Sequence, residues 1–226
     1  MGFFDISLLL MIPAMILAAA AQAKITSTYR KYSQVPVSAG LTGAQVAQRL
    51  MAENGIRNVS IGEVPGNLTD HYDPRNKRLG LSRGVYGGTS VAALGVAAHE
   101  IGHALQDAQG SPLLRFRNAF APVAQLGSNM AIPLVFIGLL LGWVGLAEIG
   151  IMFFMAVVIF QLITVPVELD ASRKALTMLR EGGYMQTAEL TGAKKVLNAA
   201  ALTYIASLVV ALANLLRLVL LVRNDS

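Results

Sequence analysis

The stretch VAAHEIGHALQ, residues 96–106, carries the pattern His-Glu-x-x-His at His99, Glu100 and His103. On a helix, His99 and His103 lie on one face about one turn apart, so both imidazoles reach a tetrahedral Zn²⁺ at about 2.0–2.1 Å. Glu100 follows the first histidine and is placed to take a proton from a water that the metal activates. The alternative is a buried helix whose histidines bond to neighbouring groups. The complete pattern, in a chain with only three histidines, favours a metal site.

The helix that carries this pattern is expected to begin near Thr89 or Ser90 and to end at Gly110. The apolar run before His99 covers only residues 91–98, far below the ~17–25 residues of a membrane span. An intramembrane metalloprotease, with the pattern inside a span, is therefore the weaker alternative.

A capped helix and two short strands are expected before this helix. Residues 42–54 read as a helix, with Thr42 at the start of a capping box. Residues 58–64 alternate as a strand, and RLGLS at residues 78–82 reads as another. We expect residues 24–127 to form a small α+β zincin-like domain.

The composition indicates a membrane protein. The chain has 226 residues, of which 54% are hydrophobic and 14% charged, against roughly 25% charged in an average soluble domain. The net charge of +5 does not form a basic stripe with aromatics between, so we expect no nucleic-acid partner. The absence of cysteine excludes disulfides and thiolate metal sites.

Three membrane segments are expected outside the zincin-like domain. Residues 1–23 read as a retained N-terminal anchor; the alternative is a cleaved signal peptide, because Ala21-Gln22-Ala23 has the form of a signal-peptidase site. Residues 128–167 read as a helical hairpin with its tip at Ala147–Glu148, and residues 199–226 as a last helix that crosses the membrane or lies in its interface. The fold class is thus a mainly α, multi-span membrane protein with a small α+β catalytic domain.

The basic residues predict the orientation. Eleven Lys and Arg lie between Lys24 and Arg117 and five between Arg173 and Lys195, whereas the hairpin tip has none. The positive-inside rule places both segments in the cytoplasm. The hairpin then returns the helical segment of residues 168–198 to the same membrane face as the zincin-like domain.

A third metal ligand is expected in that returning segment. Glu168 and Asp170 directly follow the hairpin, and spacing alone does not separate them. Asp107 lies about 12 Å from His99 along the helix and cannot share the metal with both histidines. His71 is possible, because HYD is expected in a loop between strands. The alternative without a metal is a carboxylate at the membrane interface that pairs with Arg173 or Lys174.

Four stretches give a resemblance over nearly the whole chain: KYSQVPVSAGLTGAQVAQRLM, DHYDPRNKRLGLS, AAHEIGHALQDA and PVELDASRKAL. The chain resembles the bacterial, membrane-bound neutral zinc metallopeptidases of the YugP-like family, and more distantly the HtpX-like membrane proteases. The distant pattern E-x-x-A-D implies Glu168 as the third ligand of a gluzincin-type site, with Ala171 in its alanine position. Its aspartate position is Ser172 here, so Asp170 is a candidate substitute.

The expected function is a zinc metalloendopeptidase of the bacterial plasma membrane, with its site facing the cytoplasm. Glu100 is its base, Zn²⁺ its cofactor, the lipid bilayer its environment, and a peptide or membrane protein its substrate. The strand at residues 78–82 is expected at a sheet edge, where it aligns an extended substrate. Candidates for stabilising the oxyanion are His71, Tyr72 and Tyr184.

The rival expectation is a non-catalytic, zinc-stabilised membrane scaffold or chaperone. A structural zinc is closed by a fourth protein ligand, which His71 or Asp170 would supply. The glutamate after the first histidine favours the enzyme, because a structural site needs no base there.

Overall fold

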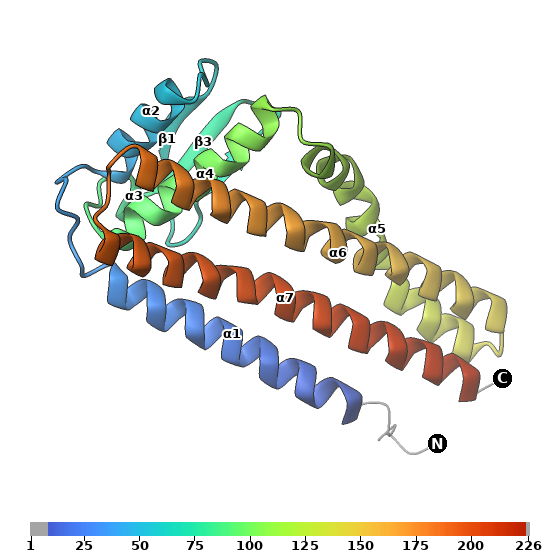
Figure 1. Cartoon of the computed structure of the whole chain (residues 1–226). Coiled ribbons are helices and arrows are strands. Elements are labelled where there is room, and N and C mark those ends of the chain that lie inside the picture. Colours follow the sequence, from blue (N-terminus) through green and yellow to red (C-terminus); the bar gives the residue numbers. More distant parts are fainter. Residues whose placement is uncertain (1–8, 225–226) are drawn as a thin grey trace. The chain divides into compact units, whose positions relative to one another are not determined.

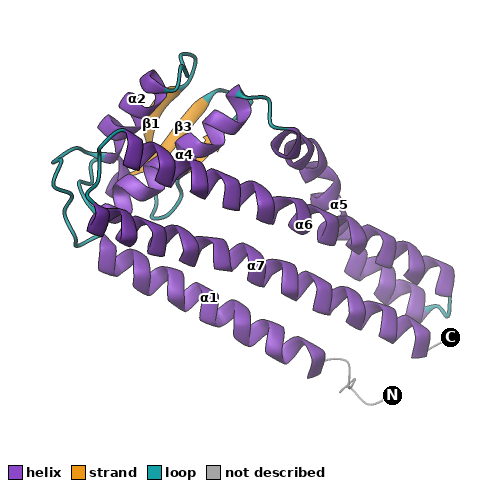
Figure 2. Ribbon diagram, viewed as in Figure 1, coloured by secondary structure: helices purple, strands orange, loops and turns teal. Residues whose placement is uncertain are grey.

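The protein is mostly helical, with one small sheet (Figure 2). The computed structural model describes residues 9–224. In chain order the elements are α1 (Met11–Tyr32), α2 (Gly43–Glu53), β1 (Ser60–Val64), β2 (His71–Asp73), β3 (Arg78–Ser82), α3 (Arg83–Tyr86), α4 (Val91–Ala108), α5 (Pro112–Leu140), α6 (Val144–Glu181) and α7 (Thr187–Asn224) (Figure 1).

The chain forms two compact units. Residues 23–114 and 167–201 make up one, which contains the sheet and which we call the sheet unit. The other, the apolar unit, comprises residues 115–166 and the described parts of residues 1–22 and 202–226. Helices α6 and α7 each contribute residues to both units.

Three helices are long and apolar enough to cross a membrane: α5, α6 and α7, judged by length and composition within the described residues. This confirms the expected multi-span membrane character. The expected N-terminal anchor, residues 1–23, lies partly outside the described residues; from Met11 onward it belongs to α1, which continues to Tyr32.

The turn between α5 and α6 lies at residues 141–143, earlier than the expected tip at Ala147–Glu148, which is inside α6. Gly142 adopts φ +65° and the amide of Trp143 donates to the carbonyl of Gly138 at 2.7 Å. A glycine in this left-handed conformation ends a helix at low cost because it has no Cβ. Hydropathy alone missed the turn, since the glycine lies within an apolar run.

The sheet has the order β1-β3-β2, with β1 parallel and β2 antiparallel to β3. The expectation that residues 78–82 form an edge strand is therefore wrong: β3 is the central strand. It was missed because His71–Asp73, expected as a loop, forms β2 and pairs with β3. Leu79 and Leu81 of β3 are fully buried, as suits a central strand.

The core of the sheet unit packs around α4. Ser90 caps this helix, its Oγ accepting from the amide of Ala93 at 3.2 Å, which agrees with the expected start. The capping box of α2 is also confirmed, at Thr42 and Gln45. Buried side chains from α2, β3, α4, α6 and α7 form one apolar cluster. The middle helix α4 is thus held from several sides.

Helix α6 approaches the backbone of α4 at Gly102. A Cβ built on Gly102 would lie 2.5 Å from the carbonyl oxygen of Ala171 and 3.0 Å from its carbon. Those are backbone atoms of a helix, which cannot move aside as a flexible side chain can. The two helices pack this closely only because residue 102 is glycine and residue 171 is small.

Substitution Gly102→Ala is therefore expected to destabilise the sheet unit by about 1–3 kcal/mol, the usual range for overpacking. The measurement is the thermal unfolding midpoint of the detergent-purified chain. Gly87→Ala is the matched control, because its Cβ would meet nothing closer than 3.8 Å. Equal midpoints for the two variants would contradict the close contact.

Candidate metal centre

Three ligand groups converge inside the sheet unit. His99 and His103 come from successive turns of α4 and Glu168 from α6. Oε2 of Glu168 lies 3.2 Å from Nε2 of His99 and 3.5 Å from Nε2 of His103. One ligand atom from each of the three residues lies within 4.8 Å of the others.

The spacing of these atoms fits zinc. Ligand atoms at about 2.0–2.1 Å from a tetrahedral ion are about 3.3 Å apart, and the two measured separations lie on either side of that value. The Glu168 side chain is only 2% exposed. Burying a carboxylate this deeply is costly unless a positive charge or hydrogen bonds compensate, so the position suits a metal ligand.

A hydrogen-bond chain fixes the ring of His103. The side-chain Nε2 of Gln106 donates to the carbonyl of Val167 at 2.9 Å and to Oδ2 of Asp170 at 2.8 Å. Both partners only accept, so the Oε1 of Gln106, 3.0 Å from Nδ1 of His103, must itself be the acceptor. His103 therefore carries a proton on Nδ1, and its Nε2 is the ring nitrogen that faces Glu168.

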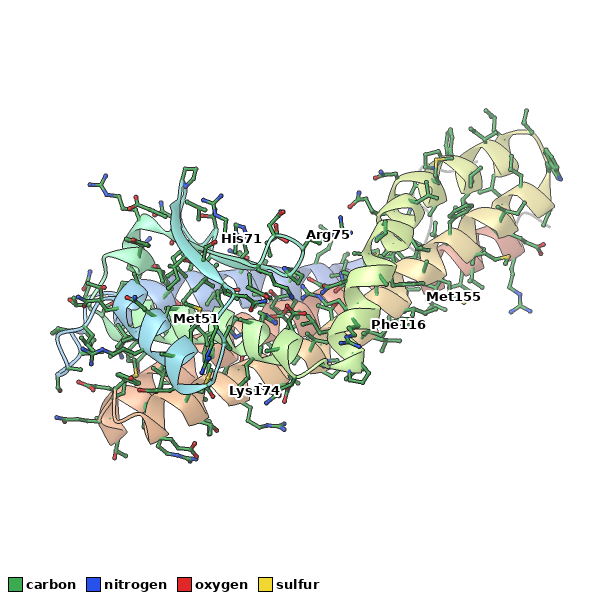
Figure 3. All side chains as sticks on the ribbon, turned by 90° about the horizontal axis from the view of Figure 1, so that it is seen from above. Met51, His71, Arg75, Phe116, Met155 and Lys174 are labelled. Atoms are coloured by element: carbon green, nitrogen blue, oxygen red, sulfur yellow. The ribbon has the colours of Figure 1, made fainter. Side chains whose placement is uncertain are left out.

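The ring of His99 is held by a hydroxyl group. Oγ of Ser172 lies 3.2 Å from Nδ1 of His99. Ser172 occupies the position where the HtpX-like pattern has aspartate, and it contacts the histidine directly. Asp170 instead bonds Gln106 and pairs with Lys174, which is labelled in Figure 3. Asp170 thus acts on His103 through Gln106 and does not take the place of Ser172 beside His99.

Sequence reasoning did not identify Gln106 and Ser172 as partners of the two histidines. Their spacing along the helices could have pointed to both. Gln106 is three residues after His103, and Ser172 is four residues after Glu168, so each shares a helix face with a ligand. A search for polar residues at these two spacings would have found them.

Glu100 lies on α4 directly after His99 and is 8% exposed. Burial is the main cause that raises the pKa of its carboxyl to about 7, and the charges of Glu168 and Asp70 raise it further. His99 and His71 act in the opposite direction on the same pKa. A carboxyl with a pKa near neutrality both accepts and gives up a proton readily.

The remaining candidates have different surroundings. The hydroxyl of Tyr72 donates to Oδ2 of Asp107 at 2.6 Å, and Lys77 pairs with the same carboxylate. The hydroxyl of Tyr184 donates to Glu53 of α2.

His71 lies on the hairpin of β2 and β3, which Figure 3 marks with His71 and Arg75. Its ring packs over Gly80, where a Cβ would lie 2.8 Å from the ring, and its Nδ1 lies 2.9 Å from the carbonyl of Thr69. Of the three aromatic candidates, His71 is the one with an electrostatic effect on Glu100.

Comparison with known proteins gives one family over nearly the whole chain. Residues 7–223 match the family described as "Putative neutral zinc metallopeptidase". The "Putative membrane protease YugP" of Bacillus subtilis (strain 168) is 45% identical over 216 residues, which cover 95% of this chain and 96% of that protein. No solved structure matches the chain. The chain therefore belongs to this family of neutral zinc metallopeptidases, whose metal is Zn²⁺, and it is a membrane protein.

Proposed function

We propose that the protein is a zinc metalloendopeptidase of the gluzincin type, in which His99, His103 and Glu168 hold the metal. The observation that carries this proposal is the convergence of their three ligand atoms, with Nδ1 of each histidine bonded elsewhere and Nε2 of each facing Glu168. When bound, Zn²⁺ supplies Lewis acidity that polarises a peptide carbonyl and lowers the pKa of a water molecule.

Glu100 is the general base of this reaction. Its carboxylate takes a proton from the attacking water and then delivers that proton to the leaving amine. Burial raises the pKa of this carboxyl toward that of a zinc-activated water, which favours transfer of the proton between the two.

An extended substrate pairs with β2, the edge strand on the side of α4. β2 contacts α4, and Tyr72 ties the strand to Asp107 of that helix. Main-chain hydrogen bonds to an edge strand align a peptide regardless of its sequence. The expected role of β3 thus passes to β2, since β3 already has a neighbour on each side.

His71 is our candidate for stabilising the oxyanion. The carbonyl of Thr69 only accepts, so the contact with Nδ1 requires a proton on that nitrogen. Nε2 of His71 then donates only when the ring is protonated. Tyr72 and Tyr184 are weaker candidates because a carboxylate already accepts from each hydroxyl.

We infer that the site faces the cytoplasm of a bacterial cell. Most of the Lys and Arg residues lie in two sequence segments, Lys24 to Arg117 and Arg173 to Lys195. Most of these two segments belongs to the sheet unit, and the positive-inside rule puts such segments on the cytoplasmic side. The substrate class that follows is a peptide or a membrane-protein segment reachable from that face.

The alternative, a zinc-stabilised scaffold, requires a fourth protein ligand. Within residues 9–224 the metal-ligating group comprises three residues, which supports an open coordination position. Asp170, one of the two residues considered for a closing ligand, is bonded to Gln106 and Lys174.

The third ligand is tested by metal content. Wild-type protein is expected to bind about one zinc per chain, and Glu168→Ala to lose most of it, because two neutral imidazoles alone hold Zn²⁺ weakly. Glu63→Ala, which removes an exposed carboxylate from β1, is the control and should keep its zinc. Zinc retained by Glu168→Ala would move the ligand to Asp170 or His71.

The base is tested by separating metal binding from turnover. Glu100→Gln is expected to keep its zinc and to lose proteolysis of an unfolded protein such as casein by about 10²–10⁴-fold. A chelator should abolish wild-type activity, and added zinc should restore it. Unchanged turnover in Glu100→Gln would refute the role given to Glu100.

The proton position on His103 is tested at Gln106. Gln106→Leu removes the acceptor that holds the proton on Nδ1, so zinc affinity is expected to fall about 10- to 100-fold. Gln48→Leu, an exposed change on α2, should leave the affinity unaltered. The measurement is competition for zinc with a chromophoric chelator; equal affinities for both variants would contradict the assigned chain.

A further inference from the structure

A cavity of the sheet unit lies between the facing sides of α6 and α7. Its volume is about 550 Å³. The residues that line it recur at helical spacing on both helices: Leu169, Ser172, Arg173, Leu176, Thr177 and Arg180 on α6, and Thr187, Leu190, Thr191, Lys194 and Asn198 on α7. We call this cavity the α6–α7 groove. Eleven residues separate Leu169 from Arg180, so the groove runs about 17 Å along the helix.

The charge of the groove is of one sign. Arg173, Arg180 and Lys194 line it, and no lining residue is acidic. Arg180 pairs with the exposed Glu181 at 3.5 Å, whereas Arg173 of α6 and Lys194 of α7 line opposite walls of the groove. Both are exposed to solvent. The complementary ligand therefore carries a negative charge.

The walls of the groove are apolar. Leu169, Leu176 and Leu190 contribute to them, and Leu169 is 41% exposed. Leu169 lies two residues after the apolar run of α6, residues 144–167, and Asn198 directly precedes the apolar run of α7. The groove thus begins where both helices change from membrane-like to water-like composition. A ligand that fits is amphipathic, with an anionic head and an apolar tail.

An extended peptide is a poor occupant of this groove. Both walls are α-helices, whose backbone amides and carbonyls bond within the helix, so a peptide main chain would find no partners there. A phosphate ester needs only point charges and hydroxyl donors, which Lys, Arg and the lining threonines supply.

We propose that the α6–α7 groove binds an anionic phospholipid, with its phosphate between Arg173 and Lys194 and its acyl chain along Leu169. This site is separate from the peptidase chemistry, although Ser172 belongs to both places: it lines the groove and bonds His99. A lipid bound there holds the α6 segment that carries Ser172 and Glu168.

The test uses the full chain in detergent, titrated with dioleoylphosphatidylglycerol and followed by native mass spectrometry. The variant is Arg173→Gln with Lys194→Gln. The matched control is Arg75→Gln with Lys195→Gln, which removes the same charge from exposed residues that do not line the groove. Dioleoylphosphatidylcholine is the neutral probe, and glycerol phosphate tests for binding of a soluble phosphate alone.

Wild type and control are expected to bind phosphatidylglycerol in preference to phosphatidylcholine, and the groove variant to bind it about 30-fold more weakly, as two lost charges near a headgroup imply. Zinc content should be the same in all three proteins, so that failure of this proposal is distinct from failure of the metal site. Equal lipid affinity in the groove variant and the control would overturn the proposal. Displacement of the lipid by glycerol phosphate at millimolar concentration would also overturn the proposal, because the site would then recognise a free phosphate.

Discussion

The contact between Gly102 of α4 and Ala171 of α6 is the constraint on which the metal centre depends. A tetrahedral ion needs its ligand atoms about 3.3 Å apart, and the two histidines come from one helix while the glutamate comes from another. Side chains as short as Glu168 bridge that gap only if the two backbones nearly touch. The glycine lies between the two histidines in the chain, at the level where the glutamate must arrive.

Hydrogen bonds behind the histidines fix which ring nitrogens face Glu168. Gln106 accepts from His103 and donates to both Val167 and Asp170, so the amide has no freedom to flip. That arrangement costs burial of polar groups, which is offset because each group has a partner. It also joins α4 to α6 a second time, one turn beyond Gly102. The same bonds therefore orient the ring of His103 and hold the helix that carries Glu168.

The sequence predicted the parts whose signals are local. The period of α4, the cap at Thr42 and the pair His99 and His103 depend on residues within one or two helical turns, and the structure agrees with all of them. It did not predict the central place of β3, because strand order depends on which segment pairs with which. The turn at Gly142 was missed for another reason: a positive φ leaves no trace in hydropathy.

Glu168 lies between these two cases. The expected hairpin placed it on the same membrane face as the histidines, but spacing left it equal to Asp170, and only the resemblance separated the two carboxylates. In the structure the two carboxylates point to different partners, Glu168 to the histidines and Asp170 to Gln106 and Lys174. Two residues along a helix are about 200° apart around its axis, so they cannot serve one ion equally. Because α6 continues through this region, Glu168 and Asp170 point in different directions around the helix axis, and this distinguishes them as candidate ligands.

Proline at position 166 marks the place where α6 passes from the apolar unit to the sheet unit. Pro166 lies inside α6, two residues before Glu168, and lacks the amide that would bond four residues back in the helix. On its C-terminal side, α6 is fixed to α4 through the Val167 carbonyl and through Ala171. The distances between Glu168 and the two histidines are therefore set by contacts within the sheet unit, on the C-terminal side of the proline.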